Sequence, residues 1–545
     1  MKEFKRWLLN KVSPVAIGDL PKAKVEELLK EFSTSPIKQV LIISYDKFRL
    51  QKESIVAMGH NIGLVILDEG HKIKNSGAQI TRAVMQIPTK RRILLTGTPM
   101  QNDLKEFFAM VDFCNPGVLG TLKSFSNFFE KPIMASRDIN ASSKELALGD
   151  EKFDRLGKLT QVFILRRTAD LLIEYLPPKV EQVVFCRPSN LQCELYEYYI
   201  QSKAVHQILE GSKSFALDCM QALQQLCNHP HLIYDRVQES AAQDKKDKEE
   251  EESGAYGFAD ASFPGDYNKM QAQPNYSGKF NVLADLLHEI RNNSEDRVVL
   301  VSLSVKMLDI FQMLCKEKNY PFLRLDGSTG SDVRQKYVDA FNAKDSKYFV
   351  FLLSSKAGGV GLNLIGANRL ILYDSDWNPA TDKQAMARIW RDGQKKKVWL
   401  YRFLSTGTIE EKIFQRQLAK TGLSRSVVDS ALSKVHFSKD ELKDIFTLNV
   451  HTDSDTHDLI GCTCWEGGHA DEDLENLDLL ARQNDISKWK HVKGVDNASD
   501  EFLRTIQNQQ LVTSIFEMHT NPKHFVVTEE QIQEEDGQEM DDEQE

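Results

Sequence analysis

Two adjacent carboxylates follow an apolar run in the first part of the chain. Asp68 and Glu69 open the sequence DEGH, directly after the apolar residues 62–67. In an open parallel sheet, ligands bind outside the carboxyl ends of the strands. At such an end, Asp68 could hold Mg²⁺ while Glu69 orients or deprotonates an attacking water. A chance pair of surface carboxylates is the alternative, and the position after a strand argues against it.

Two glycine-containing loops carry further groups that could meet a nucleotide. Thr98 lies in the sequence LTGTP, where its hydroxyl group would cap a helix, sense the nucleotide site, or do both. The segment Ser354–Asn363 has three glycines within four residues, among them Gly359 and Gly361. Backbone amides there could approach a phosphate closely, and a plain loop is the alternative.

A fourth signal comes from arginines on one expected helix face. Trp377 begins the sequence WNPA, and a helix is expected over 381–390. Gln384, Arg388 and Arg391 have the spacing i, i+4, i+7 and would share one face of that helix. The two guanidinium groups would form a surface salt-bridge network or stabilise charge developing on a γ-phosphate.

The elements that position these groups can be predicted from apolar runs of strand length and from helical patterns. In the first half, strand-length runs alternate with helical patterns, and the second half alternates in the same way. This alternation predicts two α/β units with parallel sheets. The expected strands are 40–43, 64–67, 93–95, Val298–Ser302, Phe322–Leu325, Tyr348–Leu353, Arg369–Tyr373 and Val398–Phe403, and helices are expected through 104–111 and over Asp332–Asn342 and Thr381–Trp390.

Composition separates further regions and limits the function. From Glu529 onward there are ten acidic residues and no Lys or Arg, so the net charge of −10 is carried there and the rest sums to about zero. Any polyanion site must therefore be a local basic surface. No run approaches the roughly 18 apolar residues that span a bilayer. The eight scattered cysteines fit reduced thiols in the cytosol or nucleus.

In their order, these motifs resemble those of superfamily-two helicases, specifically the Swi/Snf-type DNA translocases. The similar blocks include DEGH, LTGTPMQN, FILRRT, LCNHP, Ser277-Gly278-Lys279, DGST and WNPA…WRDGQ, over roughly residues 1–450. DEGHKIKNS, LPPKVEQVVFCRP and SDTHD are most similar to the recombination-repair branch, the Rad-fifty-four-like proteins and especially their B paralogue.

The resemblance implies two RecA-like lobes with ATP and Mg²⁺ in the cleft between them. Asp68 and Glu69 would serve the metal and the water, and Arg388 and Arg391 would reach across from the second lobe. Nucleotide contacts would come from His71, Gly359, Gly361 and Gln384, and DNA contacts from Ser44, Tyr45, Lys74, Thr98, Ser302, Lys356 and Trp377. The expected regions are 1–120, a partial first lobe; 121–236, a helical insertion; 237–277, a disordered linker; 278–436, the second lobe; 437–527, a small C-terminal region; and 528–545, a disordered acidic tail.

The family pattern breaks at its phosphate-binding loop. Such a motor needs a Gly-rich loop ending in Gly-Lys-Thr, and the chain has no such segment. The pairs Gly157-Lys158 and Gly278-Lys279 are followed by Leu and Phe. The sequence MKEF at the start resembles the family's sequence just after the loop and the next motif, so the first lobe should lack a strand. We expect a truncated gene model, a fragment or an alternative start, and very low ATP turnover by this chain alone.

Metal ligands are a separate question. The family's C-terminal region can hold a structural zinc, and here Cys462 and Cys464 have His457, His469 and His491 as partners. Their CxC spacing, where CxxC is favoured, argues against the zinc site, which stays an alternative. In the sequence CNHPH at 227–231, packing beside the apolar helix 217–226 is favoured over a ligand cluster.

Three functions remain open. The first is a nuclear, DNA-dependent ATPase that translocates on double-stranded DNA in homologous recombination and binds a RecA-like recombinase, with no membrane partner. The second is a nucleosome remodeller of the same family. The third, supported only by the missing loop, is a catalytically silent protein that binds DNA or the recombinase.

Overall fold

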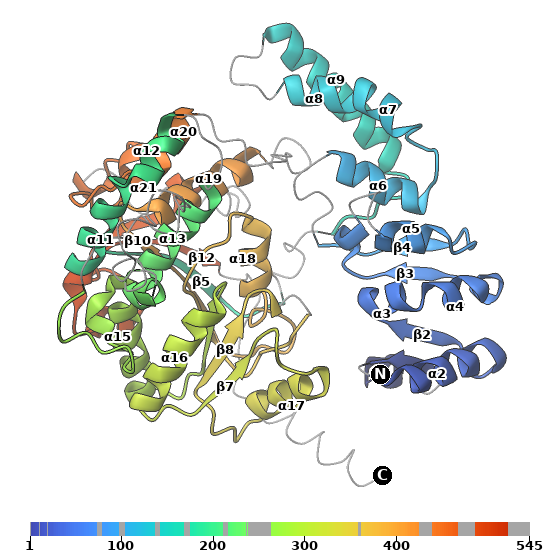
Figure 1. Ribbon diagram of the computed structural model, residues 1–545, viewed down its shortest axis with the longest axis horizontal. Coiled ribbons are helices and arrows are strands. Elements are labelled where there is room, and N and C mark those ends of the chain that lie inside the picture. Colours follow the sequence, from blue (N-terminus) through green and yellow to red (C-terminus); the bar gives the residue numbers. More distant parts are fainter. Residues whose placement is uncertain are drawn as a thin grey trace, which may run out of the picture. The chain divides into compact units, whose positions relative to one another are not determined.

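The computed structural model describes residues 2–9, 11–18, 20–73, 79–97, 104–136, 142–167, 175–210, 216–235, 237, 263–357, 361–423, 439–466 and 485–520. These residues form two compact units (Figure 1). Unit 1 holds the described residues up to Arg166. Unit 2 holds those from Arg167 to Gly422 and from 439 onward. No helix in the described part of the chain has the length and apolar character to cross a bilayer.

Unit 1 begins with short parallel strands separated by helices. β1 pairs with β2 and β3 pairs with β4, each pair parallel and in two separate two-stranded sheets. One core joins both pairs, with Ile17, Phe48, Leu67 and Val84 buried in it. The three strands expected here are confirmed to within one residue. The elements are α1 (Lys2–Leu8), β1 (Pro14–Ile17), α2 (Lys22–Thr34), β2 (Val40–Ile43), α3 (Tyr45–Leu50), α4 (Lys52–Ala57), η1 (Gly59–Asn61), β3 (Val65–Leu67), η2 (Gly70–Ile73), α5 (Gln79–Met85) and β4 (Arg92–Leu94).

One face of these strands is exposed. Side chains alternate between the two faces of a strand, and Ile66 lies opposite Ile93 in the register of β3 and β4. Leu64, Ile66, Ile93 and Leu95 follow this period of two and are 45–55% exposed. The opposite face, with Leu67, belongs to the core of the unit. The strands therefore carry apolar side chains on both faces but bury only one.

Unit 1 continues as a helical part with an aromatic core. The expected helix through 104–111 is confirmed as α6, and Gly117 follows it with a positive φ of 82°. The core contains Phe107, Phe108, Phe125 and Phe129, packed with leucines of α6, of the loop after it and of α9. The elements are α6 (Leu104–Cys114), α7 (Leu122–Phe125), η3 (Ser126–Glu130), α8 (Lys131–Ala135) and α9 (Ser143–Thr160).

Unit 2 contains an eight-stranded sheet in the order β11-β12-β5-β10-β9-β6-β8-β7. The six strands from β5 to β7 in this order are parallel, while β12 is antiparallel to both β5 and β11. The predicted α/β class with a parallel sheet is confirmed, as are all five strands expected in this half. The strands are β5 (Lys179–Cys186), β6 (Val298–Ser302), β7 (Phe322–Leu325), β8 (Val350–Ser354), β9 (Arg369–Leu372), β10 (Val398–Ser405), β11 (Lys490–Lys493) and β12 (Val512–Thr520).

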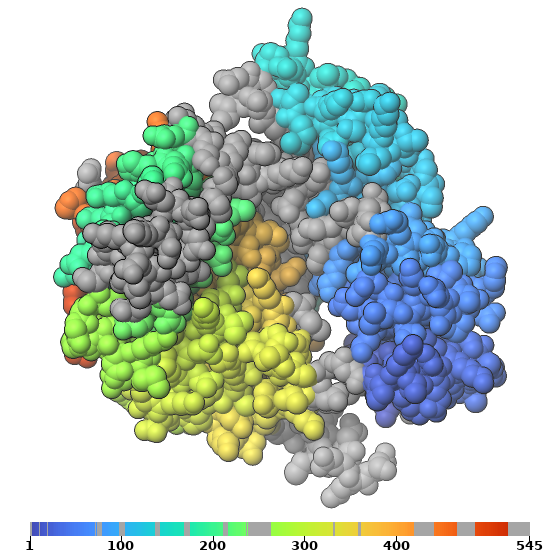
Figure 2. Space-filling model, in the orientation of Figure 1, coloured from blue at the N-terminus to red at the C-terminus, as the bar shows by residue number. Residues whose placement is uncertain are grey.

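Helices cover both faces of this sheet. One buried cluster contains Leu286, Leu300 and Ile371, and another contains Val299, Phe341 and Leu370 from the opposite strand faces. Figure 2 shows α15 to α17, coloured yellow-green to yellow, along the visible side of the unit. The helices are α11 (Asn190–Ile200), α12 (Lys203–Glu210), α13 (Ala216–Asn228), α15 (Gly278–Asn293), α16 (Val305–Glu317), α17 (Ser331–Asn342), α18 (Pro379–Met386), α19 (Ile409–Leu423), α20 (Lys439–Ile445), α21 (Asp455–Ile460) and α23 (Glu501–Thr505), with the short turns η4 (Pro230–Leu232), η6 (Pro274–Tyr276), η8 (Cys464–Glu466), η10 (Ile486–Lys488) and η11 (Gln509–Leu511).

The sheet of unit 2 takes strands from outside the region expected for the second lobe, 278–436. β5 comes from the expected helical region 121–236, and β11 and β12 come from the expected C-terminal region 437–527. The residue pair Gln182 and Glu517 shows how distant these segments are in sequence: their side chains form a buried hydrogen bond of 2.6 Å. Within the expected disordered linker 237–277, residues 263–277 are instead ordered: they include η6, and Ala272 and Ser277 are fully buried. Residues 238–262 and 528–545 lie outside the described residues.

Candidate functional site

In unit 1, the Asp68–Glu69 pair lies directly after β3, at the carboxyl end of the strand. Tyr45, the first residue of α3, donates its hydroxyl hydrogen to the backbone carbonyl of Asp68 over 2.8 Å. Glu69 adopts a left-handed backbone with φ of 49°. Gly70 donates its N–H to the carbonyl of Leu95 over 2.8 Å, and an added Cβ at this position would overlap the Leu94 side chain. Residues that follow β2 and β4 thus hold the turn that carries the two carboxylates.

The electrostatics of this turn suit a cation. Burial, and then the negative charges of Asp68 and Glu69, raise the pKa of Tyr45 to about 12, so the phenol stays neutral and continues to donate. Lys72 lies over the Tyr45 ring, 5.4 Å from its centre. Asp68 is exposed and Glu69 is half-buried. Carboxylate oxygens at the surface are ligands that Mg²⁺ prefers, so the pair fits the expected metal.

Ser44 lies beside this turn and has a structural contact of its own. Its hydroxyl group caps α3 by accepting the backbone N–H of Lys47 over 3.3 Å. The structure thus places all four residues, Ser44, Tyr45, Asp68 and Glu69, after the carboxyl ends of β2 and β3, and for Asp68 and Glu69 the position at a strand end was expected. Three other expected site residues, Lys74, Thr98 and Gly359, lie outside the described residues, and so does the side chain of His71.

In unit 2, a buried polar network lies beneath the carboxyl ends of β6 and β9. Asp374 accepts hydrogen bonds from the Ser302 hydroxyl group (2.8 Å), the Leu303 N–H (2.8 Å) and the Asn228 side chain (2.9 Å). Burial raises the pKa of Asp374 to about 6, although the hydrogen bonds from Leu303 and Ser302 and the charge of Lys279 oppose the shift. Ser302 has no exposed surface. The structure differs here from the expected DNA contact, because the hydroxyl group points into the network.

The same network contains a buried ion pair that sequence reasoning did not assign to a site. Lys279, with no exposed surface, donates to Glu410 (2.6 Å), to the Asn228 side-chain oxygen (2.9 Å) and to the carbonyl of Tyr373 (3.0 Å). Asn228 thus bridges Lys279 and Asp374. Lys279 and Asn228 lie in two of the motifs that carried the family resemblance, which was the available signal. Nothing in the sequence indicated Glu410 or Asp374.

The helix expected over 381–390 is shorter than expected. α18 begins after the Asn378 cap and ends at Met386, and Ala387 caps it. The N–H of Arg388 donates to the carbonyl of Ala385, three residues back, over 3.2 Å, so the α-helical hydrogen-bond ladder has ended there, and the carbonyl of Arg388 accepts the N–H of Leu364 over 3.0 Å. The prediction that Gln384, Arg388 and Arg391 share one helix face is therefore wrong, because the chain turns away after Ala387.

Arg391 is instead tied to the glycine loop. Its guanidinium group donates to the carbonyls of Leu362 (3.0 Å) and Gly361 (3.4 Å), and Gly361 has φ of 46°. Arg391 and Gln384 are partly exposed, and Arg388 is buried. Lys356, before the loop, is exposed, whereas Trp377 packs partly buried against the helical core. The structure thus brings Gly361 and Arg391 together.

A ligand group for a metal lies in the C-terminal part of unit 2. The ligand atoms of His457, Cys462, Cys464 and His491 all lie within 4.8 Å of one another. Cys464 Sγ is 3.1 Å from His457 Nε2 and 3.6 Å from His491 Nδ1. His491 Nε2 contacts the carbonyl of Ile486 at 2.9 Å, which leaves Nδ1 free to face the sulfur.

These four ligands fit a structural zinc. Bond lengths of about 2.0–2.3 Å place neighbouring ligands of a tetrahedral zinc roughly 3.3–3.8 Å apart. Trp465 stacks on the His457 ring, with ring centres 3.6 Å apart, and thereby fixes its plane. His469, the fifth expected partner, lies outside the described residues. By contrast, the segment 227–231 packs in the core, which is the alternative that the sequence favoured over a ligand cluster. His229 is buried, and burial lowers its pKa to about 3.

Comparisons with known proteins agree with both units. Residues 1–232 match the SNF2-related domain, and residues 278–393 match the helicase conserved C-terminal domain. The chain is similar to "DNA repair and recombination protein RAD54B" of Homo sapiens, with 45% identity over 93% of this chain and 57% of that protein. It is also similar to "DNA repair and recombination protein RAD54-like" of Gallus gallus, with 44% identity over 95% of this chain and 69% of that protein.

The matches cover only part of the relatives. The chain spans 57–60% of the length of three RAD54B relatives, from Homo sapiens, Gallus gallus and Mus musculus. The identities to the two kinds of relative, 45% and 44%, are nearly equal. The expected branch is confirmed, whereas the particular likeness to the B paralogue stays a prediction.

Proposed function

Because the chain belongs to the SNF2-related family, in the branch of the RAD54-like DNA repair and recombination proteins, we propose that it is an ATP-dependent motor that translocates on double-stranded DNA during homologous recombination. The observation that supports it best is the carboxylate pair Asp68–Glu69, held at the carboxyl end of β3 by Tyr45 and Gly70. Nuclear location and binding of a RecA-like recombinase belong to the same proposal.

Each group has a role in this motor. Asp68 would hold Mg²⁺, which would supply positive charge against the phosphates, and Glu69 would orient the attacking water. Arg388 and Arg391 stabilise charge on the γ-phosphate. Because Arg391 also holds the carbonyls of Gly361 and Leu362, its movement toward a nucleotide would release the glycine loop. His71, Gly359 and Gln384 complete the nucleotide contacts.

DNA contacts in the motor go mainly to phosphates, so they carry little sequence preference. Lys356 is the exposed cation of unit 2 beside the glycine loop, and Ser44 and Tyr45 lie beside the carboxylates of unit 1. Lys74, Thr98 and Trp377 complete this set. Ser302 acts through Asp374, as a positioning residue below the surface.

Turnover by these 545 residues alone is very low in this proposal, because the sequence has no Gly-Lys-Thr loop to hold the β- and γ-phosphates. The test therefore uses a version extended at its N-terminus with a segment that carries the loop. In that version, Arg391→Ala should lower DNA-stimulated ATP hydrolysis by about 10³-fold or more, while the Kd for duplex DNA stays within about twofold.

The matched control is Arg504→Ala, which removes an exposed arginine from α23 in the same unit. This control should change neither the rate of DNA-stimulated ATP hydrolysis nor the Kd for duplex DNA. ATP hydrolysis that survived Arg391→Ala would contradict the role of the arginine. Hydrolysis absent from the extended protein itself would favour the third function, a silent DNA- or recombinase-binding protein.

We also propose that His457, Cys462, Cys464 and His491 bind one structural zinc. Purified protein should contain about one zinc per chain by elemental analysis, and Cys464→Ala should lower this content to near zero. Cys315→Ala, at a buried cysteine of α16, is the control that should keep the metal. Equal zinc content in the Cys464 variant and the parent would refute the site.

A further inference from the structure

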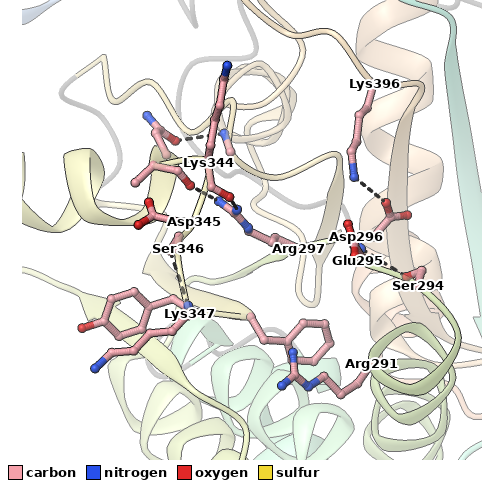
Figure 3. A pocket seen from close by; sticks show the side chains of 15 residues that line it. Arg291, Ser294, Glu295, Asp296, Arg297, Lys344, Asp345, Ser346, Lys347 and Lys396 are labelled. Carbon is pink, nitrogen blue, oxygen red and sulfur yellow. Dashed lines mark hydrogen bonds and ion pairs between the residues drawn. The ribbon is translucent and has the colours of Figure 1, made fainter.

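A pocket of about 580 Å³ opens at the amino ends of the strands in unit 2. Ser302 and Asp374 lie at the other, carboxyl ends of the strands. The loop before β6 and the loop before β8 form its walls, together with Gly366 and Lys396. Figure 3 shows Lys344 to Lys347 on one side of it and Asp296 with Lys396 on the other. None of the expected nucleotide or DNA residues lines it.

The pocket is basic at its rim. Its lining includes five cationic side chains and three carboxylates. Asp296 is largely neutralised, because it accepts from buried Arg369 over 2.7 Å and from Lys396 over 3.4 Å. Lys344, Lys347 and Lys396 are exposed, and Lys395 and Lys397 flank the last of them. This side of the sheet therefore presents an excess of positive charge to solvent.

The walls of the pocket are preformed. Arg297 donates to the carbonyls of Phe341, Ala343 and Lys344 over 2.7–2.9 Å and so caps the carboxyl end of α17. Asn342 accepts the N–H of Gly366 and donates to the carbonyl of Asn363, both at 2.9 Å. These bonds hold the two loops in place without a ligand. Binding of an anion here would therefore cost little conformational entropy.

The last strand of the sheet, β12, ends on this same side, beside the amino ends of the parallel strands. β12 runs antiparallel to β5, and its last residue, Thr520, lies opposite Lys179, the first residue of β5. β10, β9, β6 and β8 follow β5 across the sheet in that order, and all of them begin at the same end as β5. With neighbouring strands about 4.8 Å apart, the start of β6 lies about 19 Å from Thr520 and the start of β8 about 24 Å.

The residues after Thr520 have the length and charge to reach the pocket. Glu529, the first of the ten acidic residues, comes nine residues after Thr520. Fully extended, nine residues span at most about 30 Å. A flexible chain of about 18 residues, the sequence separation between Thr520 and the middle of the acidic tail, has an r.m.s. span of roughly 21–25 Å. A linker whose span matches the distance between two sites gives the highest effective concentration.

We propose that the acidic tail, residues 528–545, docks in this basic pocket of the same chain and shields it from other polyanions. Charge complementarity and the matched span carry the proposal. It does not depend on the proposed motor function, since no nucleotide or DNA residue takes part. Because the contacts are exposed ion pairs, docking should weaken as salt rises.

The test places the photo-crosslinking residue p-benzoylphenylalanine at Gln538 of the full chain and maps crosslinks by mass spectrometry. Docking predicts crosslinks within one molecule to residues 291–297 and 342–349. Lys344→Glu/Lys347→Glu should lower their yield about fivefold or more, from the loss of two attractive contacts and the gain of two repulsive ones. Lys306→Glu/Lys336→Glu makes the same charge change at exposed positions of α16 and α17 and should not lower it.

A second variant leaves the folded core untouched. Glu534→Gln/Glu535→Gln/Asp536→Asn/Glu539→Gln, all within the acidic tail, should lower the crosslink yield to a similar extent. Crosslinks spread over the surface, formed only between molecules, equal in the two lysine variants, or absent would each overturn the proposal. In those cases the tail is solvated, as the sequence alone predicts, or binds elsewhere.

Discussion

In unit 2, every residue of the central strands β6, β8, β9 and β10 is buried, whereas in unit 1 the strands β3 and β4 bury only part of their side chains. Both sequences are nevertheless rich in apolar residues on both strand faces. Parallel sheets normally have both faces covered by helices. Unit 2 follows that rule, and the described part of unit 1 does not.

The comparison teaches where each unit derives its stability. Unit 2 holds its sheet between two apolar clusters and ties the strand ends together with buried ions. The strands of unit 1 pack on one cluster through one face only, and Ile66 and Ile93 on the other face are exposed. Equivalent substitutions should therefore cost much more in unit 2. Tryptophan fluorescence can follow that unit, since five of the six tryptophans lie at or after Trp377.

The largest effect is expected from the buried ion pair. Lys279→Ala leaves Glu410 buried without its cationic partner, which typically costs about 3–5 kcal/mol. Urea unfolding followed by tryptophan fluorescence should show this loss in the free energy of unfolding of unit 2. Lys306→Ala, at an exposed lysine of α16, is the control. A loss below about 1 kcal/mol would mean that the pair does not hold the strand ends together.

The next test compares one apolar residue in each sheet. Leu300→Ala in β6 empties a fully buried position and should cost about 2–5 kcal/mol, because a cavity adds to the lost transfer energy. Ile66→Ala in β3 removes a side chain that is 55% exposed and should cost about 1 kcal/mol or less. Hydrogen exchange measured by mass spectrometry reports each unit separately. Similar losses in both would show that the exposed face of unit 1 is covered in solution.

A smaller effect is expected from the titration of Asp374. Its folded-state pKa of about 6 lies above the ordinary value near 3.9, so its contribution to stability is fully present below about pH 4 and is lost as pH rises through 6. Relative to Asp374→Asn, the free energy of unfolding of unit 2 should fall by about 2 kcal/mol between pH 4.5 and pH 7. A difference that does not change with pH would show that the carboxyl group titrates normally.

The sequence predicted local elements better than distant pairings. β6 and β7 were expected with the bounds that they have, because each is a short apolar run between clear breaks. β12 joins the sheet through β5, more than 300 residues earlier, and no local pattern indicates such a partner. The end of α18 was missed for a related reason, since the contact between Arg388 and Leu364 is tertiary.

The candidate site was predicted to a similar extent. Asp68 and Glu69 directly follow an apolar run, and this position in the sequence was sufficient to predict that they lie at a strand end. Ser302 also lies at a strand end, but its burial depends on Asp374 and Asn228, which come from other elements. Motif spacing identifies which residues belong near a site, and only the packing separates those that can contact a ligand from those that support them.

ATP hydrolysis with and without duplex DNA, by the 545-residue chain beside the version extended with a Gly-Lys-Thr loop, tests the proposed motor most directly. We predict DNA-stimulated turnover only in the extended protein, because the 545 residues include the proposed carboxylates and arginines but contain no Gly-Lys-Thr loop. DNA-stimulated turnover by the 545-residue chain alone would contradict the proposed dependence on the loop, and no turnover by either protein would contradict the motor itself.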